Sequence, residues 1–357
     1  MRIIFISAIE IIQARLDNRI LELTVIAHAT HTTRQHSRFH LLVPDNLRVA
    51  NSWQGLQNTF STSQANHIGS IGSAKDNMEP QNFKDILYAK DATGVVTLTL
   101  NTPARKNALS AVTFLEIFYA VDHFQSDDSA YAMILTGAKD PQSEDPTKEA
   151  FSSGGYFNSD AFEGIPPEVL ADIDMSDIAQ KRATLKLYAC DKPIIAAING
   201  LAIGGGVTLC LAAADQIYMS EHAWLQLPFA KLGIAAELGS TYFLPRLLGF
   251  QKAKEILFFA ERISANDAVE LGIANKVVSH SELLSYSREK VLQLIPPQGP
   301  SLSIREMKRC LHQPHMEALG QALEQENAAL ATLMATEDFV EGIMARVERR
   351  PAVFKGK

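Results

Sequence analysis

Apolar residues recur with two alternating periods from about residue 83 onward. Short apolar runs bounded by glycine, asparagine or aspartate are typical of buried strands, whereas apolar residues three and four apart are typical of helices packed by one face. Strands are predicted at 85–90, 94–100, 131–137, 192–200 and 215–220, and again just after Gly272. Helices are predicted at 110–124, 178–190, 205–214 and 264–271. This alternation indicates an α/β fold.

Polar residues mark the ends of two predicted helices. Ser110 is suited to cap the first helix, and Ser264 with Asp267 resembles a capping box. Gly272 ends the second of these helices. After His280 the pattern is helical, and one apolar stripe is suited to packing on another helix or subunit, although ordinary core packing is enough to explain it. The stripe consists of Leu319, Leu323, Leu330 and Met334.

Residues 1–79 have a different composition, rich in Ser, Asn, Gln, Gly and His. Such a segment buries too little apolar surface to fold alone. We expect a disordered extension or translated sequence upstream of a start near Met78, with metal binding or targeting as the alternative. Residues 80–278 are predicted to form the core domain, and residues 279–357 a C-terminal helical region.

Charge and cysteine usage exclude several classes of protein. A net charge of −7 gives no reason to expect nucleic acid or an anionic membrane as a partner. The three cysteines lie far apart, without the spacing of a disulfide framework or a metal site, which favours a reducing compartment. The longest apolar run, 201–214, is broken by three consecutive glycines, so no membrane span is expected.

Two glycine-rich stretches and one isolated acid are the candidates for chemistry. "AFSSGGYFN" (150–158) follows a predicted strand, and "NGLAIGGGVTL" (199–209) joins a strand to a helix. The first N–H groups of a helix lack internal partners and suit an anion or a developing oxyanion. Glu237 stands alone among small and apolar residues in "LGIAAELGS", and a buried unpaired charge is costly unless the site uses it. The alternative is a surface glutamate at a helix start.

In this order, and followed by "LPFAKLGIAAELGSTYFLPRLLG", these stretches resemble the crotonase family, the enoyl-CoA hydratase/isomerase superfamily. "NTPARKNALS", "ERISANDAVELGIANKVV" and "RRPAVFKGK" extend the resemblance from about Phe83 to Lys357. It implies a crotonase-type ββα spiral core with a C-terminal helical oligomerisation region. It also implies an acyl-CoA thioester substrate, no separate cofactor because CoA is part of the substrate, no metal, and a homotrimer or a dimer of trimers.

The family's oxyanion hole uses two main-chain N–H groups, which the resemblance assigns to Gly155 and Gly205. By the same resemblance "ARKNALS" lies along CoA, although a solvated loop is the alternative for its basic pair. Phe354 and Lys355 are expected to reach CoA from the C-terminal helix. Tyr156 stands where the family usually has aspartate, and either faces the acyl chain or packs in the interior. The predicted substrate contacts are Arg105, Lys106, Ala108, Leu109, Ser153, Gly154, Tyr156, Phe157, Leu201, Thr208, Phe229, Ile234, Phe354 and Lys355.

Hydratases of this family use two glutamates, and the resemblance places Thr208 and Phe229 at those positions. Neither side chain can transfer a proton at neutral pH, which disfavours water addition. Glu237 stands where the peroxisomal-type Δ3,Δ2-enoyl-CoA isomerases carry one catalytic glutamate. One carboxylate can reach both C2 and C4 of a 3-enoyl chain, so a single base is sufficient. An apolar pocket is expected to raise its pKa toward the value that a general base needs.

Three other functions remain open. They are a dienoyl-CoA isomerase, a hydratase-like lyase with relocated acids, and a non-catalytic acyl-CoA-binding trimer. The first normally pairs its acid with two further acids, which are missing at Phe229 and Thr208. A cytoplasmic location is expected, with a peroxisomal one as the alternative in a eukaryote, although the chain ends in Lys-Gly-Lys and not in Ser-Lys-Leu.

Overall fold

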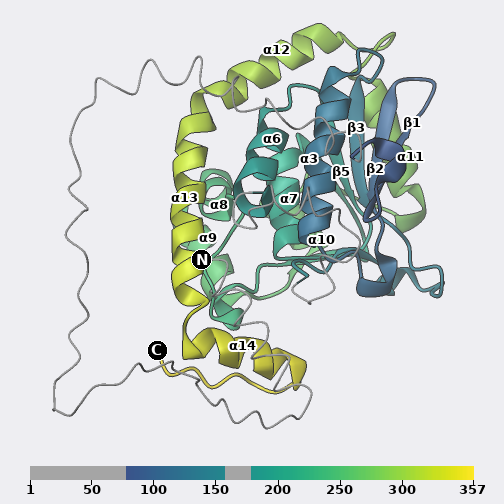
Figure 1. Ribbon diagram of the computed structural model, residues 1–357. Coiled ribbons are helices and arrows are strands. Elements are labelled where there is room, and N and C mark those ends of the chain that lie inside the picture. Colours follow the sequence, from purple (N-terminus) through teal and green to yellow (C-terminus); the bar gives the residue numbers. More distant parts are fainter. Residues whose placement is uncertain (1–77, 157–177) are drawn as a thin grey trace, which may run out of the picture. The chain divides into compact units, whose positions relative to one another are not determined.

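Two β-sheets with helices packed around them form the part of the chain that the computed structural model describes, residues 78–156 and 178–357 (Figure 1). The predictions for the segment before residue 78 and for Phe157 lie outside these ranges. The strands are β1 (Ile86–Lys90), β2 (Val95–Leu100), β3 (Ala132–Gly137), β4 (Ala150–Ser152), β5 (Ile194–Ile198), β6 (Leu201–Ile203), β7 (Gln216–Ser220), β8 (Trp224–Gln226), β9 (Ile263–Ser264) and β10 (Lys276–Val278).

Nine α-helices of at least seven residues and one shorter helix are described. They are α3 (Ala111–Ser126), α6 (Ala183–Ala189), α7 (Gly205–Ala213), α8 (Ser240–Leu248), α9 (Phe250–Phe259), α10 (Ala265–Glu270), α11 (Leu283–Leu292), α12 (Ser301–His312), α13 (Met316–Leu333) and α14 (Glu337–Val347), of which α10 is the shortest. Short 3₁₀ turns are η1 (Pro80–Asn82), η2 (Pro103–Arg105), η3 (Pro146–Lys148), η6 (Ala230–Leu232), η7 (His280–Glu282) and η8 (Gln313–His315). The predicted helix 178–190 is divided, because a π-helical turn η5 (Ile178–Arg182) precedes α6.

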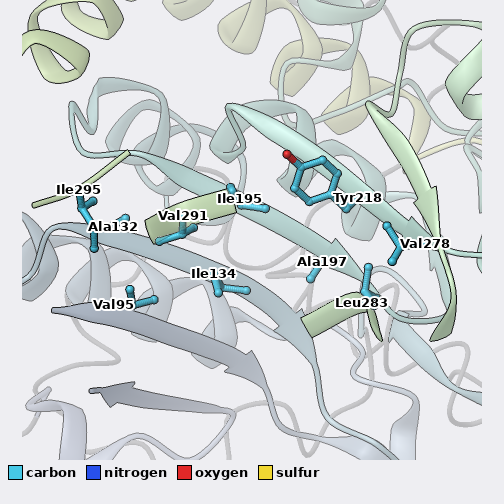
Figure 2. Packing of buried hydrophobic residues seen from close by; sticks show 10 residues of the cluster. All are labelled: Val95, Ala132, Ile134, Ile195, Ala197, Tyr218, Val278, Leu283, Val291 and Ile295. Atoms are coloured by element: carbon cyan, nitrogen blue, oxygen red, sulfur yellow. The ribbon is translucent and has the colours of Figure 1, made fainter. Parts of the chain in front are cut away.

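The larger sheet has the strand order β1-β2-β3-β5-β7-β10. Only the β1–β2 hairpin is antiparallel, and the other neighbours pair in parallel. Side chains alternate between the two faces of a strand, so Ile195 and Ala197 of β5 share one face. On that face they pack beside Leu283 and Val291 of α11 in a buried apolar cluster (Figure 2).

The smaller sheet has the order β4-β6-β8-β9. Its strands β4, β6 and β8 run parallel, with Ala202 of β6 opposite Leu225 of β8, and β9 pairs antiparallel to β8. A register shift separates Ala150 and Ser152 on β4. Since parallel strands end at the same edge of a sheet, the residues that follow β4, β6 and β8 lie close together.

The predicted helix ends are confirmed. Ser110 accepts from the Thr113 N–H in a capping box that opens α3, and Ser264 with Asp267 forms the capping box of α10. Leu319 and Leu323 of the predicted stripe are fully buried against α6, α7 and α8. No described helix is long and apolar enough to cross a membrane.

The junction between α12 and α6 contains a titratable ring. His312 stacks on Tyr188 with ring centroids 4.1 Å apart, and its Nδ1 lies 2.7 Å from the Tyr188 carbonyl oxygen. Burial lowers the pKa of His312 below its ordinary value of 6.5. The folded protein therefore binds a proton here less readily than the unfolded chain does, and this difference costs stability at low pH.

We expect the His312→Phe variant, which keeps a stacked ring but cannot titrate, to show a flatter loss of stability in acid. The free energy of unfolding, measured by denaturant titration between about pH 7 and about pH 5, should fall more for the native protein than for the variant. At neutral pH the variant should be less stable by about 1 kcal/mol, because it lacks the hydrogen bond. If the free energy of unfolding fell equally with pH in the two proteins, the loss of stability in acid would not come from His312.

Candidate active site

A cavity of about 110 Å³ lies where β4, β6 and β8 end. The segments that follow these strands provide its floor: Ser153 to Gly155 after β4, Gly204 and Gly205 after β6, and Phe229 after β8. The remaining walls come from the segment 232–237 and from α14. The full lining is Ser153, Gly154, Gly155, Ile203, Gly204, Gly205, Pro228, Phe229, Leu232, Ile234, Glu237, Ile343 and Arg346.

The main chain at Gly155 is oriented by its neighbours. The Leu109 N–H donates to the Gly154 carbonyl over 2.8 Å, and the Tyr156 N–H donates to the Leu109 carbonyl over 2.8 Å. In such a parallel bridge the residue between the two bonded neighbours turns its own N–H to the opposite side. Gly154 has a φ of +88°, and a Cβ there would lie 2.7 Å from the Ile203 carbonyl oxygen, so only glycine fits. The Gly155 N–H consequently points away from Leu109.

Gly205 is the first residue of α7, and its N–H is one of the groups that a helix leaves without an internal partner. No main-chain hydrogen bond joins the N–H of Gly155 or Gly205 to another carbonyl of the described segments. A methyl group placed on Gly205 would lie 3.8 Å from Oε1 of Glu237, which puts that carboxylate beside the helix start. Two main-chain amides and one carboxylate therefore face a shared space.

Glu237 is held in a tight turn just before α8. Its side chain is buried, with 9% of the residue exposed, and its carbonyl accepts hydrogen bonds from the N–H and the hydroxyl of Ser240. The next residue, Leu238, has a φ of +56°, which is unfavourable for a side chain of this kind. Surrounding contacts must hold this conformation.

A second buried acid supplies these contacts. Glu326 of α13 accepts the Gly239 N–H at Oε2 and the Thr241 N–H at Oε1, each over 2.8 Å, and the Thr241 hydroxyl also donates to it. Burial raises the pKa of Glu326, although its hydrogen bonds act in the opposite direction. The carboxylate thus fixes the start of α8, immediately after Glu237.

The family model described as enoyl-CoA hydratase/isomerase matches residues 90–357. The chain belongs to the enoyl-CoA hydratase/isomerase family. Its similarity extends to named relatives: it is 32% identical over 267 residues to a carnitinyl-CoA dehydratase of Escherichia coli, covering 74% of this chain and 95% of that one. Proteins of this family act on acyl-CoA thioesters, so the chain is an acyl-CoA enzyme of the crotonase superfamily.

Solved structures of family members share the fold. An enoyl-CoA hydratase/isomerase from Pseudoalteromonas atlantica superposes with a TM-score of 0.63 at 26% identity, covering 76% of this chain and all of that one. An enoyl-CoA hydratase from Bacillus anthracis gives a TM-score of 0.56 at 28% identity, covering 77% of this chain and all of that one. The predicted crotonase-type architecture with helices at the C-terminus is confirmed.

Seven of the seventeen residues predicted for the site line the cavity. These are Ser153, Gly154, Gly155, Gly205, Phe229, Ile234 and Glu237. Tyr156 is half-buried beside it, under the guanidinium of Arg105, whose carbon lies 4.3 Å from the ring centroid.

The segment predicted to lie along CoA has its two basic residues in different settings. Arg105 forms an ion pair with Asp85 over 2.6 Å, whereas the Lys106 side chain is exposed. Ala108 and Leu109 are buried beneath them. Of the two, only Lys106 is exposed, and whether either contacts CoA stays a prediction.

Besides Tyr156 and the residues of the 105–109 segment, four more predicted residues are absent from the cavity lining. Thr208 is fully buried in α7, with its hydroxyl 3.3 Å from the Gly205 carbonyl oxygen, and Leu201 is half-buried in β6. Phe354 and Lys355 are exposed in a C-terminal tail, where the Lys355 N–H donates to Asp338 of α14. In a single chain these two do not contribute to the cavity.

Sequence reasoning missed Glu326 and the α14 residues Ile343 and Arg346. For Glu326 a signal exists, because it stands in the apolar stripe between Leu323 and Leu330, where a charged side chain is out of place. For α14 no local signal exists, since its contact with the cavity depends on tertiary packing.

Replacing Glu326 should disturb the turn that carries Glu237. In Glu326→Gln one accepting oxygen is replaced by an NH₂ group, which cannot accept a hydrogen bond from the main-chain N–H that faces it. We therefore expect the free energy of unfolding to fall by about 1–3 kcal/mol. We also expect a lower kcat at nearly unchanged KM. Denaturant titration and steady-state kinetics would measure these effects. The matched control is Glu324→Gln on the same helix. Glu324 is exposed and pairs with Lys181, and the loss of this ion pair should lower the free energy of unfolding by under about 1 kcal/mol. Equal effects of the two substitutions would contradict a special role for Glu326.

Proposed function

We propose that the chain is a Δ3,Δ2-enoyl-CoA isomerase that moves a double bond by a proton transfer through the single base Glu237. The observation that supports this most directly is the content of the cavity. Among the described residues that line it, Glu237 is the only carboxylate, and it lies beside the amides of Gly155 and Gly205. The arrangement offers one proton acceptor and two donors for a thioester oxygen.

The chemistry requires no further group. Glu237 removes a proton from C2 of a 3-enoyl thioester, and the electron pair spreads over C2, C4 and the thioester oxygen as a dienolate. The Gly155 and Gly205 N–H groups donate to that oxygen, and each such donor typically contributes about 3–4 kcal/mol to lowering the barrier. Glu237, now protonated, returns the proton at C4, which leaves the double bond between C2 and C3.

The names of the relatives favour a second candidate, the addition or elimination of water. That reaction needs one group to activate water and another to protonate carbon, and Phe229 and the buried Thr208 offer neither. The cavity is also unfavourable for a carnitinyl-CoA, the compound in the name of the Escherichia coli relative. A carnitinyl group carries a quaternary ammonium, and the positive charge of Arg346 in the cavity lining would repel it.

The proposal is tested with Glu237→Gln. We expect kcat for the isomerisation of 3-enoyl-CoA to fall about 100- to 10,000-fold, because a neutral amide cannot accept the proton. The measurement is the rise in absorbance of the conjugated thioester. Hydration of 2-enoyl-CoA and isomerisation of 3,5-dienoyl-CoA are followed in parallel with the native protein.

The control is Glu261→Gln, an exposed glutamate 3.1 Å from Lys231, which should leave turnover unchanged. Circular dichroism would establish that both variants fold. Faster hydration than isomerisation by the native protein would support the second candidate, and full activity of Glu237→Gln would exclude Glu237 as the base. Binding of every thioester without turnover would favour a non-catalytic acyl-CoA-binding protein.

A further inference from the structure

The α14 wall of the cavity is set by two close backbone contacts. A Cβ on Gly342 would lie 2.6 Å from the carbonyl carbon and oxygen of Leu232. A Cβ on Gly233 would lie 2.8 Å from the Asp338 carbonyl oxygen. Neither position has room for a side chain, so α14 lies directly against η6 and the residue that follows it.

This contact determines which side chains of α14 face the cavity. Residues three and four apart lie on the same side of a helix, and Gly342 shares its side with Phe339, Ala345 and Arg346. Phe339 and Ala345 are buried in the contact, whereas Ile343 and Arg346 line the cavity. Arg346 is therefore placed at the cavity by the packing of its helix, even though the residue is exposed to solvent.

The Arg346 guanidinium takes no part in the ion pairs described for this end of the chain. Elsewhere in this region Arg350 pairs with Glu341 and Glu348, and Lys355 pairs with Glu337. No hydrogen bond or ion pair joins the Arg346 side chain to another residue in the ranges 78–156 and 178–357. Its five donors are available to a ligand.

The surroundings indicate the chemistry of that ligand. Apart from Glu237, Arg346 and Ser153, whose hydroxyl donates to the Arg105 carbonyl, the described lining is apolar or main chain. A guanidinium in such a concave site suits a carboxylate or phosphate, which it binds with two parallel hydrogen bonds. With the thioester oxygen at Gly155 and Gly205, the whole pantetheine arm separates the CoA phosphates from this space. The anion must then belong to the acyl group.

We propose that Arg346 binds a carboxylate carried by the acyl group, so that the preferred substrates are CoA monothioesters of short unsaturated dicarboxylic acids. The chain between thioester and carboxylate must be short, because Arg346 lines the same small cavity as the two amides. This inference rests on the proposed function for the identity of the reacting group. The recognition of the carboxylate itself does not depend on the reaction.

The test compares hex-3-enedioyl-CoA with its methyl ester, which has the same chain without the charge. For the native protein kcat/KM should favour the acid at least about tenfold. In Arg346→Met the ratio of the two kcat/KM values should fall to about one. In Arg346→Lys it should be intermediate, because lysine keeps the positive charge but cannot form the two parallel hydrogen bonds of a guanidinium. The control is Arg349→Met, an exposed arginine outside the cavity lining, which should keep the native preference.

Affinity provides an independent measurement. The dissociation constants of adipoyl-CoA and its methyl ester, measured by calorimetry, should show the same preference and the same loss in Arg346→Met. If no 3-enoyl thioester is isomerised, the proposed function fails while this comparison still tests Arg346. Two results would overturn the inference: no preference for the acid in the native protein, or an equal loss for acid and ester in Arg346→Met, which would assign Arg346 to CoA or to the fold.

Discussion

The parallel pairing of β4, β6 and β8 is the constraint on which the site depends. Because these three strands run in the same direction, Gly155, Gly205 and Phe229 meet at one edge of the small sheet. Leu109 then fixes the orientation of the first amide by bonding to both of its neighbours. The donors of the cavity are thus main-chain groups held by a hydrogen-bond ladder, and they need no rearrangement when a ligand arrives.

Glu237 is held in place by a different set of contacts. Glu237 belongs to a strained turn, and the strain at Leu238 is maintained by hydrogen bonds from the Gly239 and Thr241 N–H groups to Glu326. A buried carboxylate that accepts several donors is far less costly than one without partners. The two acids are therefore complementary: one anchors the turn, and the other faces the cavity.

The features that could be predicted from the sequence are those set by interactions between residues close together in the chain. The caps at Ser110 and Ser264, the glycine turns and the strands of the large sheet depend on neighbouring residues and were predicted correctly. The wall formed by α14 was not predicted, because it depends on Gly342 meeting Leu232 across a large sequence separation. Thr208 was predicted at the cavity from the family resemblance, but its hydroxyl turns back to the Gly204 and Gly205 carbonyls at the start of its own helix.

Much of the cavity floor is glycine backbone, whereas one of its walls is made of side chains from a separate helix, α14. Arg346 and Ile343 belong to α14, whereas the hydrogen bonds that orient the Gly155 amide come from Leu109, and Gly205 begins α7. Under the proposed function, single changes on α14 would therefore alter the selectivity for the acyl group without disturbing the two amides. A fold organised in this way can diversify its substrates while its central chemistry persists.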